Sequence, residues 1–215
     1  MKKAVNTLKS IGRQARGFTI PSVTKIARLK DPYRVLVSCI LSLRTKDKTT
    51  IEASRRLFKV AAAPEGMVKL SVARLAKLIY PVGFYHTKSK VILDLSRKMI
   101  KEYNGKVPGR IEDLLNFKGV GRKTANLVLG LGFNIPAICV DTHVHRISNR
   151  LGWVRTKTPE ETEFALEKII PRKYWIELNT ILVGFGQNLC KPVLPLCSRC
   201  FVRNNCKRVN VKVSR

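Results

Sequence analysis

A short glycine turn, Gly119-Val120-Gly121, constrains the fold of this chain more than any other stretch, because it separates two helical runs. The first run covers residues 111–117. The second begins at Arg122 and directs a set of apolar side chains inward: Ala125, Leu127, Val128, Leu129 and Leu131. Glycine permits backbone angles closed to other residues and leaves space for a close ligand. We therefore expect the N–H groups of Gly119, Gly121 and Arg122 to point outward at a helix start, an arrangement that binds an anion.

Two residues near this turn have the chemistry of a catalytic pair. Lys123 follows the turn directly, and Asp141 lies eighteen residues later in a stretch that otherwise lacks carboxylates. A lysine attacks carbon as the neutral amine, a form that desolvation and nearby positive charge favour. A carboxylate can stabilise a cationic sugar intermediate or move protons. The hypothesis is that both residues act on a nucleotide beside a bound phosphate; a solvated lysine and a helix-capping aspartate are the alternatives.

The charge balance indicates a polyanionic partner. The 215 residues include 42 Lys and Arg against 14 Asp and Glu, a formal net charge of +28. Such an excess is typical of nucleic-acid-binding proteins and predicts binding that weakens as salt rises. A generally basic surface, or a ribosomal-type protein, would have the same charge, so composition alone does not separate these classes.

Apolar residues recur at helical spacing along most of the chain, and no period-two strand pattern appears, which predicts an all-α fold. The basic segment 1–30 contains no acidic side chain, and we expect it to be partly helical. No apolar run reaches membrane-spanning length, and the N-terminus lacks the apolar core of a signal peptide. The expectation is a monomeric, cytoplasmic and nucleoid-associated protein without membrane contact.

Four of the six cysteines, Cys190, Cys197, Cys200 and Cys206, lie within seventeen residues in the pattern C-x6-C-x2-C-x5-C. Four cysteines are the usual ligand set of a [4Fe–4S] cluster and also of structural zinc. The long first spacing and the single C-x2-C pair favour iron–sulfur slightly over zinc. Disulfides are a third alternative, which the expected intracellular location disfavours. The two remaining cysteines lie in apolar runs, where we expect buried thiols.

Two residues are candidates to enter a DNA base stack. Arg44 ends a helical run, and Phe84 lies in a turn that Gly83 opens. A planar cation and a flat apolar ring can both fill the space that an extruded base leaves. Core packing is the alternative for Phe84. His143, two residues after Asp141, is a candidate to line the same cleft.

The motifs together resemble the endonuclease III family of helix-hairpin-helix DNA glycosylases with an iron–sulfur cluster. The matching segments are Gly119-Val120-Gly121-Arg122-Lys123-Thr124-Ala125-Asn126, Val140-Asp141-Thr142-His143 and the cysteine quartet, supported by Leu41-Ser42 with Asp47 and Gly83-Phe84-Tyr85 with Lys88. The likeness covers residues 20 to 206, nearly the whole chain. Its three main motifs are independent of one another and occur in the family's order, which makes chance agreement improbable.

The resemblance implies two α-helical domains that flank a DNA cleft. One would be a six-helix domain over residues 24–135, with the helix-hairpin-helix at about residues 111–133. The other would join residues 1–23 to residues 136–215 and hold the cluster in a loop over residues 190–206. The implied partner is double-stranded DNA that contains a damaged base or an abasic site.

The resemblance also implies a bifunctional glycosylase and lyase that removes oxidised pyrimidines and cleaves the strand 3′ to the abasic site. Lys123 would attack the sugar C1′ and form a Schiff base, and Asp141 would assist the displacement before β-elimination. The other implied site residues are Gly119, Gly121, Arg122, Lys118, Arg44 and Phe84 for DNA contact, His143 and Thr45 for the damaged-base pocket, and Cys190, Cys197, Cys200 and Cys206 for the cluster.

The chain departs from the family pattern at two places. Phe117-Lys118 stands where the bacterial family usually has Leu-Pro, and Arg44 stands where a glutamine commonly faces the space of the extruded base. Adenine glycosylases of the same fold lack the catalytic lysine, so Lys123 favours a lyase. A competing hypothesis is a non-catalytic DNA-binding protein that uses the hairpin alone, although plain binding does not require Asp141 with His143 at this spacing.

Overall fold

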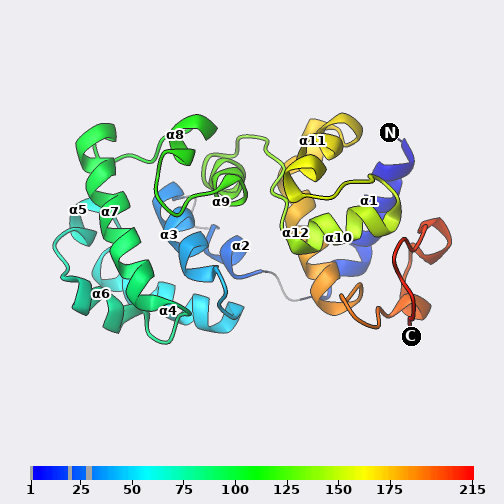
Figure 1. Ribbon diagram of the computed structural model, residues 1–215, viewed down its shortest axis with the longest axis horizontal. Coiled ribbons are helices and arrows are strands. Elements are labelled where there is room, and N and C mark those ends of the chain that lie inside the picture. The colour runs from blue at the N-terminus through cyan, green and yellow to red at the C-terminus, as the bar shows by residue number, and fades with distance from the viewer. Residues whose placement is uncertain (1, 19–20, 28–30) are drawn as a thin grey trace. The chain divides into compact units, whose positions relative to one another are not determined.

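The computed structural model describes residues 2–18, 21–27 and 31–215, and within these ranges the chain forms helices and turns without a β-strand. The predicted all-α class is therefore confirmed. Of the basic N-terminal segment, residues 1, 19–20 and 28–30 lie outside the described residues. The chain folds as two compact units, which Figure 1 colours by residue number. We call residues 22–135 the continuous unit, and residues 1–21 with 136–215 the split unit.

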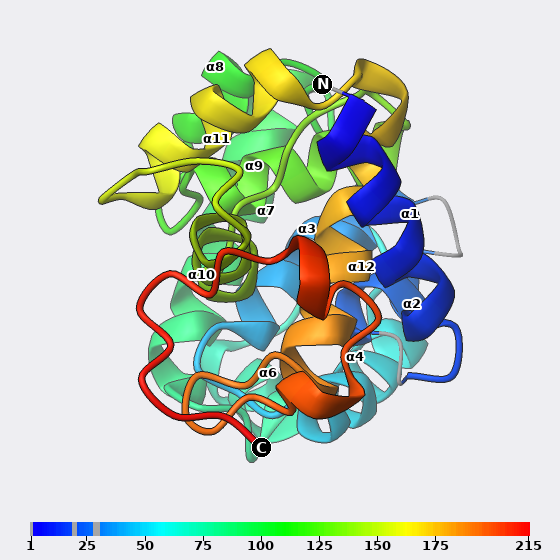
Figure 2. The ribbon, with the colours of Figure 1, turned by 90° about the vertical axis from the view of Figure 1, so that its right-hand side faces the viewer.

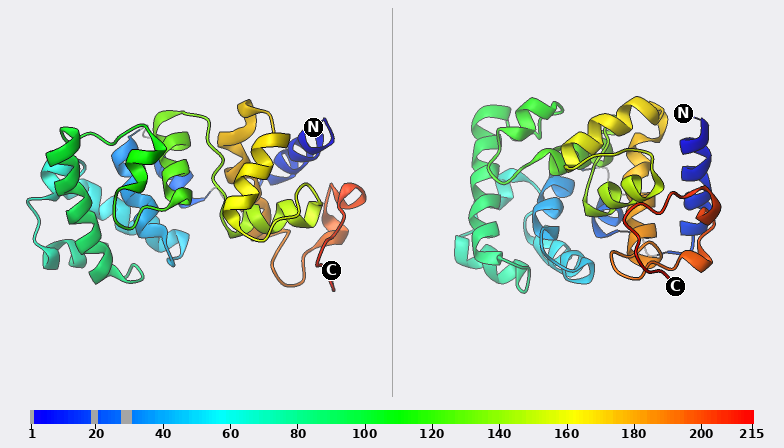
Figure 3. Two further views of the ribbon diagram at one scale, coloured as in Figure 1. Left: turned by 45° about the horizontal axis from the view of Figure 1, so that its top comes forward. Right: turned by 45° about the vertical axis from the view of Figure 1, so that its right-hand side comes forward.

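The continuous unit is built around α3, which packs against α2, α4, α7, α9 and η1. Its elements are α2 (Ser22–Ala27), α3 (Pro32–Ser42), α4 (Asp47–Val60), α5 (Pro64–Met67), α6 (Val72–Ile79), α7 (Tyr85–Tyr103), α8 (Ile111–Leu115), α9 (Arg122–Leu127) and the π-helical turn η1 (Val128–Gly132). The longest, α7, runs beside α6 in each view of Figure 3.

The sequence of α3 explains its central place. Asp31 caps the helix by accepting a hydrogen bond from the N–H of Arg34 at 3.1 Å, and Pro32 occupies the first turn, where no N–H is needed. The helix is apolar on all sides and its middle is fully buried, as expected of a helix enclosed by others. Helix α3 also lies close to η1, because a Cβ added at Gly132 would be only 3.0 Å from the Cα of Pro32.

The split unit brings the two ends of the chain together. Its elements are α1 (Lys2–Ala15), α10 (Thr142–Leu151), α11 (Pro159–Ile169), the 3-10 turn η2 (Arg172–Tyr174), α12 (Trp175–Asn188) and two further 3-10 turns, η3 (Cys197–Arg199) and η4 (Arg203–Asn205). Helix α12 packs against both α1 and α10, and these three surround one apolar core (Figure 2). The core contains Leu8, Ile147, Leu182 and Phe185.

A variant of the capping box starts α11. The Thr158 hydroxyl accepts the N–H of Glu161 at 3.1 Å, but the Glu161 carboxylate reaches back to the N–H of Lys157, one residue before the cap, at 2.8 Å. Within the described ranges, no helix has the length and apolar character needed to cross a bilayer.

Candidate active site and cysteine pocket

The glycine turn forms a hairpin between α8 and α9 in the continuous unit. Its middle is closed by a hydrogen bond from the N–H of Val120 to the carbonyl of Phe117 at 3.1 Å. Gly119 has φ +83°, and a Cβ there would lie 3.1 Å from Cγ1 of Val91, so the turn requires glycine at this position. Phe117 anchors the hairpin, because its side chain is buried beside the ring of Tyr103 at 5.5 Å.

Gly121 has a different role from the one its sequence suggested. Its φ of −101° is open to any residue, so the expectation of a special backbone angle is wrong there. The relevant feature is the open space around Gly121, because a Cβ added there would meet no atom within 4 Å. The N–H groups of Gly119 and Gly121 donate to no acceptor among the described residues. Two backbone donors therefore stand exposed at the start of α9, next to open surface.

Lys123 lies in the first turn of α9, and its side chain is exposed. Lys118, in the hairpin, is exposed as well. Below Lys123 is the buried thiol of Cys39 on α3. Burial raises the pKa of Cys39 to about 12, and the charge of Lys123 opposes this rise, which places the ammonium within electrostatic reach of the core. The hairpin thus presents positive charge and backbone donors on one surface.

Asp141 begins α10 in the split unit. Its Oδ1 accepts hydrogen bonds from the N–H groups of His143 and Val144, both at 2.9 Å, so the capping interpretation is confirmed. Both bonds end on the same oxygen, which leaves Oδ2 outside the cap. A capping carboxylate with a second oxygen can also act in catalysis, so the two interpretations remain compatible.

His143 packs against α12. A Cβ on Gly186 would lie 2.4 Å from Nδ1 of His143, so only glycine there makes room for the imidazole. The same nitrogen lies 3.2 Å from a guanidinium nitrogen of Arg146, which donates to it and also to the carbonyl of Cys190 at 2.9 Å. Arg146 therefore connects the beginning of α10 to the segment that carries the cysteines.

Arg44 and Phe84 lie on adjacent turns of the continuous unit. Both have left-handed backbone angles, with φ 51° for Arg44 and φ 58° for Phe84. The Phe84 ring is 62% exposed, so core packing, the alternative for this residue, is wrong. The guanidinium of Arg44 lies 5.6 Å from the centre of that ring, in cation–π range. An exposed apolar ring beside an exposed cation is suited to contact with stacked bases.

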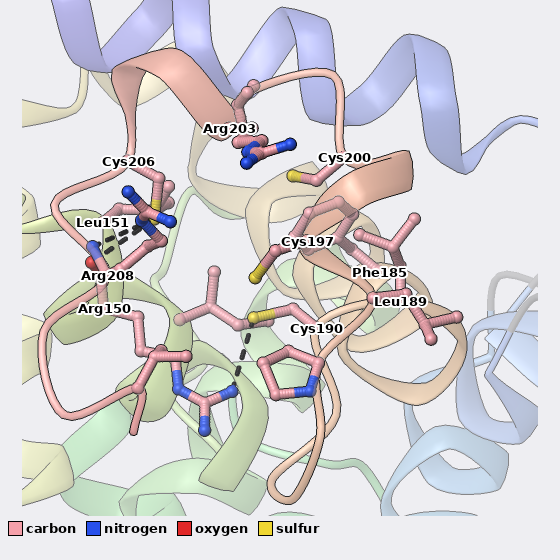
Figure 4. A pocket seen from close by; sticks show the side chains of 15 residues that line it. Arg150, Leu151, Phe185, Leu189, Cys190, Cys197, Cys200, Arg203, Cys206 and Arg208 are labelled. Carbon is pink, nitrogen blue, oxygen red and sulfur yellow. Dashed lines mark hydrogen bonds between the residues drawn. The ribbon is translucent and has the colours of Figure 1, made fainter. Parts of the chain in front are cut away.

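The four clustered cysteines line one small cavity in the split unit, with a volume of about 30 Å³. All four thiols are free and half-buried, and their sulfur atoms face a common space above α10 and α12 (Figure 4). The floor is apolar and includes Ile147, Leu151, Phe185 and Leu189. No disulfide links these cysteines, so the third alternative from the sequence is not what the structure contains.

Arg150 fixes the first cysteine. Its guanidinium donates to the Sγ of Cys190 at 3.6 Å, to the carbonyl of Lys191 at 2.6 Å and to the carbonyl of Pro192 at 2.7 Å. Arg146 and Arg150 are four residues apart and so lie on one face of α10. No local pattern in the sequence indicates this role, because α11 and α12 lie between α10 and the cysteines along the chain.

The donor set of this cavity consists of four cysteine thiols. Burial raises the pKa of the Cys200 thiol to about 11, and the neighbouring thiols add to the rise, so thiolates here require a nearby cation. Within the described residues, no group of three or more His, Cys, Asp or Glu side chains is arranged to hold one metal ion. Zinc needs four sulfurs at about 2.3 Å from a common centre. Four free thiols around one cavity match the ligand number of a structural zinc ion and of a [4Fe–4S] cluster alike.

The C-terminal segment, residues 207–215, contributes to this pocket. The N–H of Arg215 donates to the carbonyl of Pro195, and the N–H of Ser198 donates to the carbonyl of Arg215, both at 2.9 Å. The N–H of Val209 donates to the carbonyl of Arg150 at 3.2 Å. In Figure 2 this segment, in red, crosses in front of α10. Arg208 and Val211 line the cavity.

Comparison with known proteins agrees with the hairpin and the helical fold. Residues 37–172 match the model of a family described as the HhH-GPD superfamily of base excision DNA repair proteins. The fold and the hairpin thus define a helix-hairpin-helix base excision repair protein. The sequence is 51% identical over 177 residues to Endonuclease III of Thermotoga maritima, which covers 82% of this chain and 83% of that protein. The chain belongs to the endonuclease III family, and it is a DNA glycosylase with lyase activity.

More distant relatives extend the match. The chain is 44% identical over 177 residues to Endonuclease III-like protein 1 of Gallus gallus, of which the alignment covers 63%, and 81% of this chain. A solved structure described as a trapped Endonuclease III–DNA covalent intermediate has a TM-score of 0.85 at 30% identity, over 96% of this chain and 95% of that one. A thermostable thymine-DNA glycosylase has a TM-score of 0.84 at 25% identity, over 96% of each chain.

Proposed function

We propose that this enzyme removes oxidised pyrimidine bases from duplex DNA and cleaves the strand 3′ to the resulting abasic site. The observation that carries the proposal is the placement of Lys123, whose exposed side chain stands in the first turn of α9 directly after the glycine hairpin. A phosphate bound at the hairpin would bring the adjacent deoxyribose within range of this amine. A covalent DNA intermediate of a family relative supports a nucleophile in such an enzyme.

DNA binding in this proposal begins at the hairpin. The N–H groups of Gly119 and Gly121 donate to a phosphate, and the open space at Gly121 admits its oxygen atoms. Lys118 and Arg122 add positive charge beside them. The net charge of +28 supplies long-range attraction to the backbone and makes binding weaken with salt.

The chemistry proceeds through the Lys123 amine. Its nitrogen forms a bond to C1′ while the bond from C1′ to the base breaks, and the base leaves with the electron pair and takes up a proton. Ring opening gives a Schiff base between Lys123 and C1′. Loss of a C2′ proton then expels the 3′ phosphate, which is β-elimination. In the proposal Asp141 stabilises the cationic sugar and assists the proton transfers. Lys123 and Asp141 belong to different units, and the mechanism requires both to face the same nucleotide.

Arg44 and Phe84 occupy the space that the damaged nucleotide vacates on extrusion. An arginine carries donors only, so it pairs with acceptors on the opposite base, such as the O6 and N7 atoms of guanine. His143 lines the pocket for the extruded base. Thr45 was expected in the same pocket, and its hydroxyl makes three hydrogen bonds within the protein, to Leu43, Gly83 and Lys88. These bonds favour a role in holding the turn of Arg44.

Cys190, Cys197, Cys200 and Cys206 would hold a [4Fe–4S] cluster, which would cross-link the two ends of the 190–206 segment that follows α12. The shared cavity and the four free thiols support this assignment. Iron and sulfide analysis of purified protein is expected to give both elements and little zinc. Zinc without iron would contradict it. Cys139→Ala is the matched control, because Cys139 is buried in the same unit outside the cavity and its loss should leave the iron content unchanged.

Borohydride trapping tests the proposed reaction. A duplex that contains thymine glycol or an abasic site, incubated with enzyme and reductant, is expected to give a covalent complex that Lys123→Gln abolishes. Lys118→Gln is the matched control, because Lys118 is equally exposed on the same hairpin and its loss should weaken binding while trapping persists. No trapped complex with the unaltered enzyme, or equal binding of damaged and undamaged duplex, would contradict the proposal and favour a binding protein.

A further inference from the structure

The two turns that carry Arg44 and Phe84 are joined to each other. The hydroxyl of Thr45 accepts a hydrogen bond from the N–H of Gly83 at 3.1 Å. A Cβ on Gly83 would lie 2.6 Å from the carbonyl oxygen of Arg44, so the two backbones are in direct contact. We call residues 43–45 and 82–84 the paired turns. They present Arg44 and Phe84 side by side, although thirty-nine residues of chain separate the start of one turn from the start of the other.

Lys88, in α7, lies beneath the paired turns and is only 6% exposed. Its ammonium donates to the carbonyl of Leu41 at 2.9 Å, to the carbonyl of Leu43 and to the hydroxyl of Thr45 at 3.2 Å. An ammonium has three N–H donors, so all three are used. Two of the acceptors are carbonyls at the end of α3, which have no partner within the helix and where positive charge is favoured.

A buried lysine is a costly way to fill this space. Burial lowers the pKa of Lys88 to about 8. Its three hydrogen bonds go to uncharged oxygen atoms, and no carboxylate is among these acceptors. An apolar side chain of the same length would avoid the desolvation but would leave these oxygen atoms without their donor. The backbone groups that the ammonium holds therefore account for its place here.

The conformation of the paired turns requires such a support. Arg44 and Phe84 both have left-handed backbone angles, which are strained for residues other than glycine. Phe84 is 62% exposed, so burial of its ring does not offset this strain. The hydrogen bonds of Lys88 and Thr45 hold the backbone on both sides of Arg44, and the contact at Gly83 holds the neighbouring turn.

We infer that Lys88 is a positioning residue, which locks the paired turns into one rigid wedge so that Arg44 and Phe84 enter the DNA together. The inference rests on the proposed function, in which these two side chains fill the space of the extruded nucleotide. A wedge that is ordered before binding does not lose conformational entropy when it enters the stack. Lys88 touches neither DNA nor the reacting atoms; it acts through the two turns.

Lys88→Met tests this role, because methionine keeps the volume and removes all three donors. The measurement is the ratio of dissociation constants for an undamaged duplex and for a duplex with a stable abasic-site analogue. Loss of hydrogen bonds to a charged group is worth a factor of about ten or more, so this ratio is expected to fall about tenfold. Binding of undamaged duplex should not change. An unchanged ratio in the folded variant would overturn the inference.

Thermal unfolding shows whether Lys88→Met folds. If it does not fold, a second variant provides the test. Thr45→Val removes the hydroxyl that joins the turns and leaves Lys88 its two carbonyl acceptors. It is expected to lower the same ratio by a smaller factor, and a wild-type ratio in this variant would also overturn the inference.

A double-mutant cycle separates positioning from general stability. If Lys88 acts through the wedge, Lys88→Met should change the binding ratio much less in a Phe84→Ala background than in the unaltered protein. Equal effects in both backgrounds would overturn the inference.

Fluorescence of 2-aminopurine placed opposite the abasic analogue reports base unstacking and should fall in Lys88→Met. If the proposed function itself were wrong, the unaltered protein would show no preference for abasic DNA, which distinguishes that outcome from failure of the inference about Lys88.

Discussion

The guanidinium of Arg150 donates a hydrogen bond to the Sγ of Cys190 at 3.6 Å, and so α10 contacts the first cysteine of the pocket directly. Asp141 caps the same helix nine residues earlier. Arg146, between them, donates to the carbonyl of Cys190. One helix of the split unit therefore begins at the proposed catalytic carboxylate and is fixed further along to the cysteine segment. A substitution that disturbs the cysteine pocket should therefore also shift the position of Asp141.

Arg150→Met is expected to weaken the cysteine pocket. Arg150 is 8% exposed and donates to a thiol and two carbonyls, which would lose their donors together. Such a loss costs about 1–3 kcal/mol for each buried group left unpaired. In the proposed cluster-bound protein, iron should be released faster to a chelator, and the visible absorbance should decay in parallel.

Arg155→Met is the control for this experiment. Arg155 is an exposed arginine of the same unit that does not line the cysteine cavity, and the substitution removes the same charge from the chain. It should release iron at the unaltered rate. Equal release from both variants would show that net charge, and not the hydrogen bonds of Arg150, retains the iron.

Two substitutions of Asp141 should separate its capping role from its proposed catalytic role. Asparagine is also a good cap, so Asp141→Asn is expected to keep the stability and to lose most of the glycosylase rate. Asp141→Ala removes both hydrogen bonds to the start of α10 and should cost about 1 kcal/mol in addition. Chemical denaturation and single-turnover cleavage measure the two effects. Full activity in Asp141→Asn would remove the carboxylate from the mechanism.

Local sequence rules predicted much of this fold. The side chains of Asp31, Ser71 and Thr158 each accept a backbone N–H at the start of a helix, as residues of these types commonly do. The turn at Gly119 has the expected left-handed angle. These features depend on a few adjacent residues, and the physics of a cap or a glycine turn does not change with the rest of the fold.

Long-range contacts could not be predicted in the same way. The ammonium of Lys88 meets carbonyls from residues more than forty positions earlier, and no local pattern announces such a partner. The backbone of Arg215 pairs with Pro195 and Ser198, contacts that no local pattern predicts. The spacing of the four cysteines predicts a ligand set, whereas the contact of Arg150 with Cys190 depends on the packing of α10 beside the cysteine segment.

The two glycines of the hairpin should respond differently to alanine. Gly119 has φ +83°, and the added Cβ would crowd Val91, so Gly119→Ala is expected to destabilise the protein by about 1 kcal/mol. Gly121 has an ordinary angle and open space, so Gly121→Ala should leave stability nearly unchanged. Both add a methyl group at the proposed phosphate site, and both should weaken DNA binding. Normal DNA affinity in Gly121→Ala would exclude close phosphate approach at that position.

Removal of residues 209–215 should expose the cysteine pocket without unfolding the helices. The segment pairs with Pro195, Ser198 and Arg150, and Val211 lines the cavity, but no helix includes any of its residues. Groups that surround metal ligands affect retention by factors of about 10–100, so iron release to a chelator is expected to accelerate about tenfold. Lys212→Ala in the full chain, which removes an exposed charge and keeps the backbone bonds, should release iron at the unaltered rate. A truncated protein that retains its iron as well as the full chain would show that the four cysteines and Arg150 suffice.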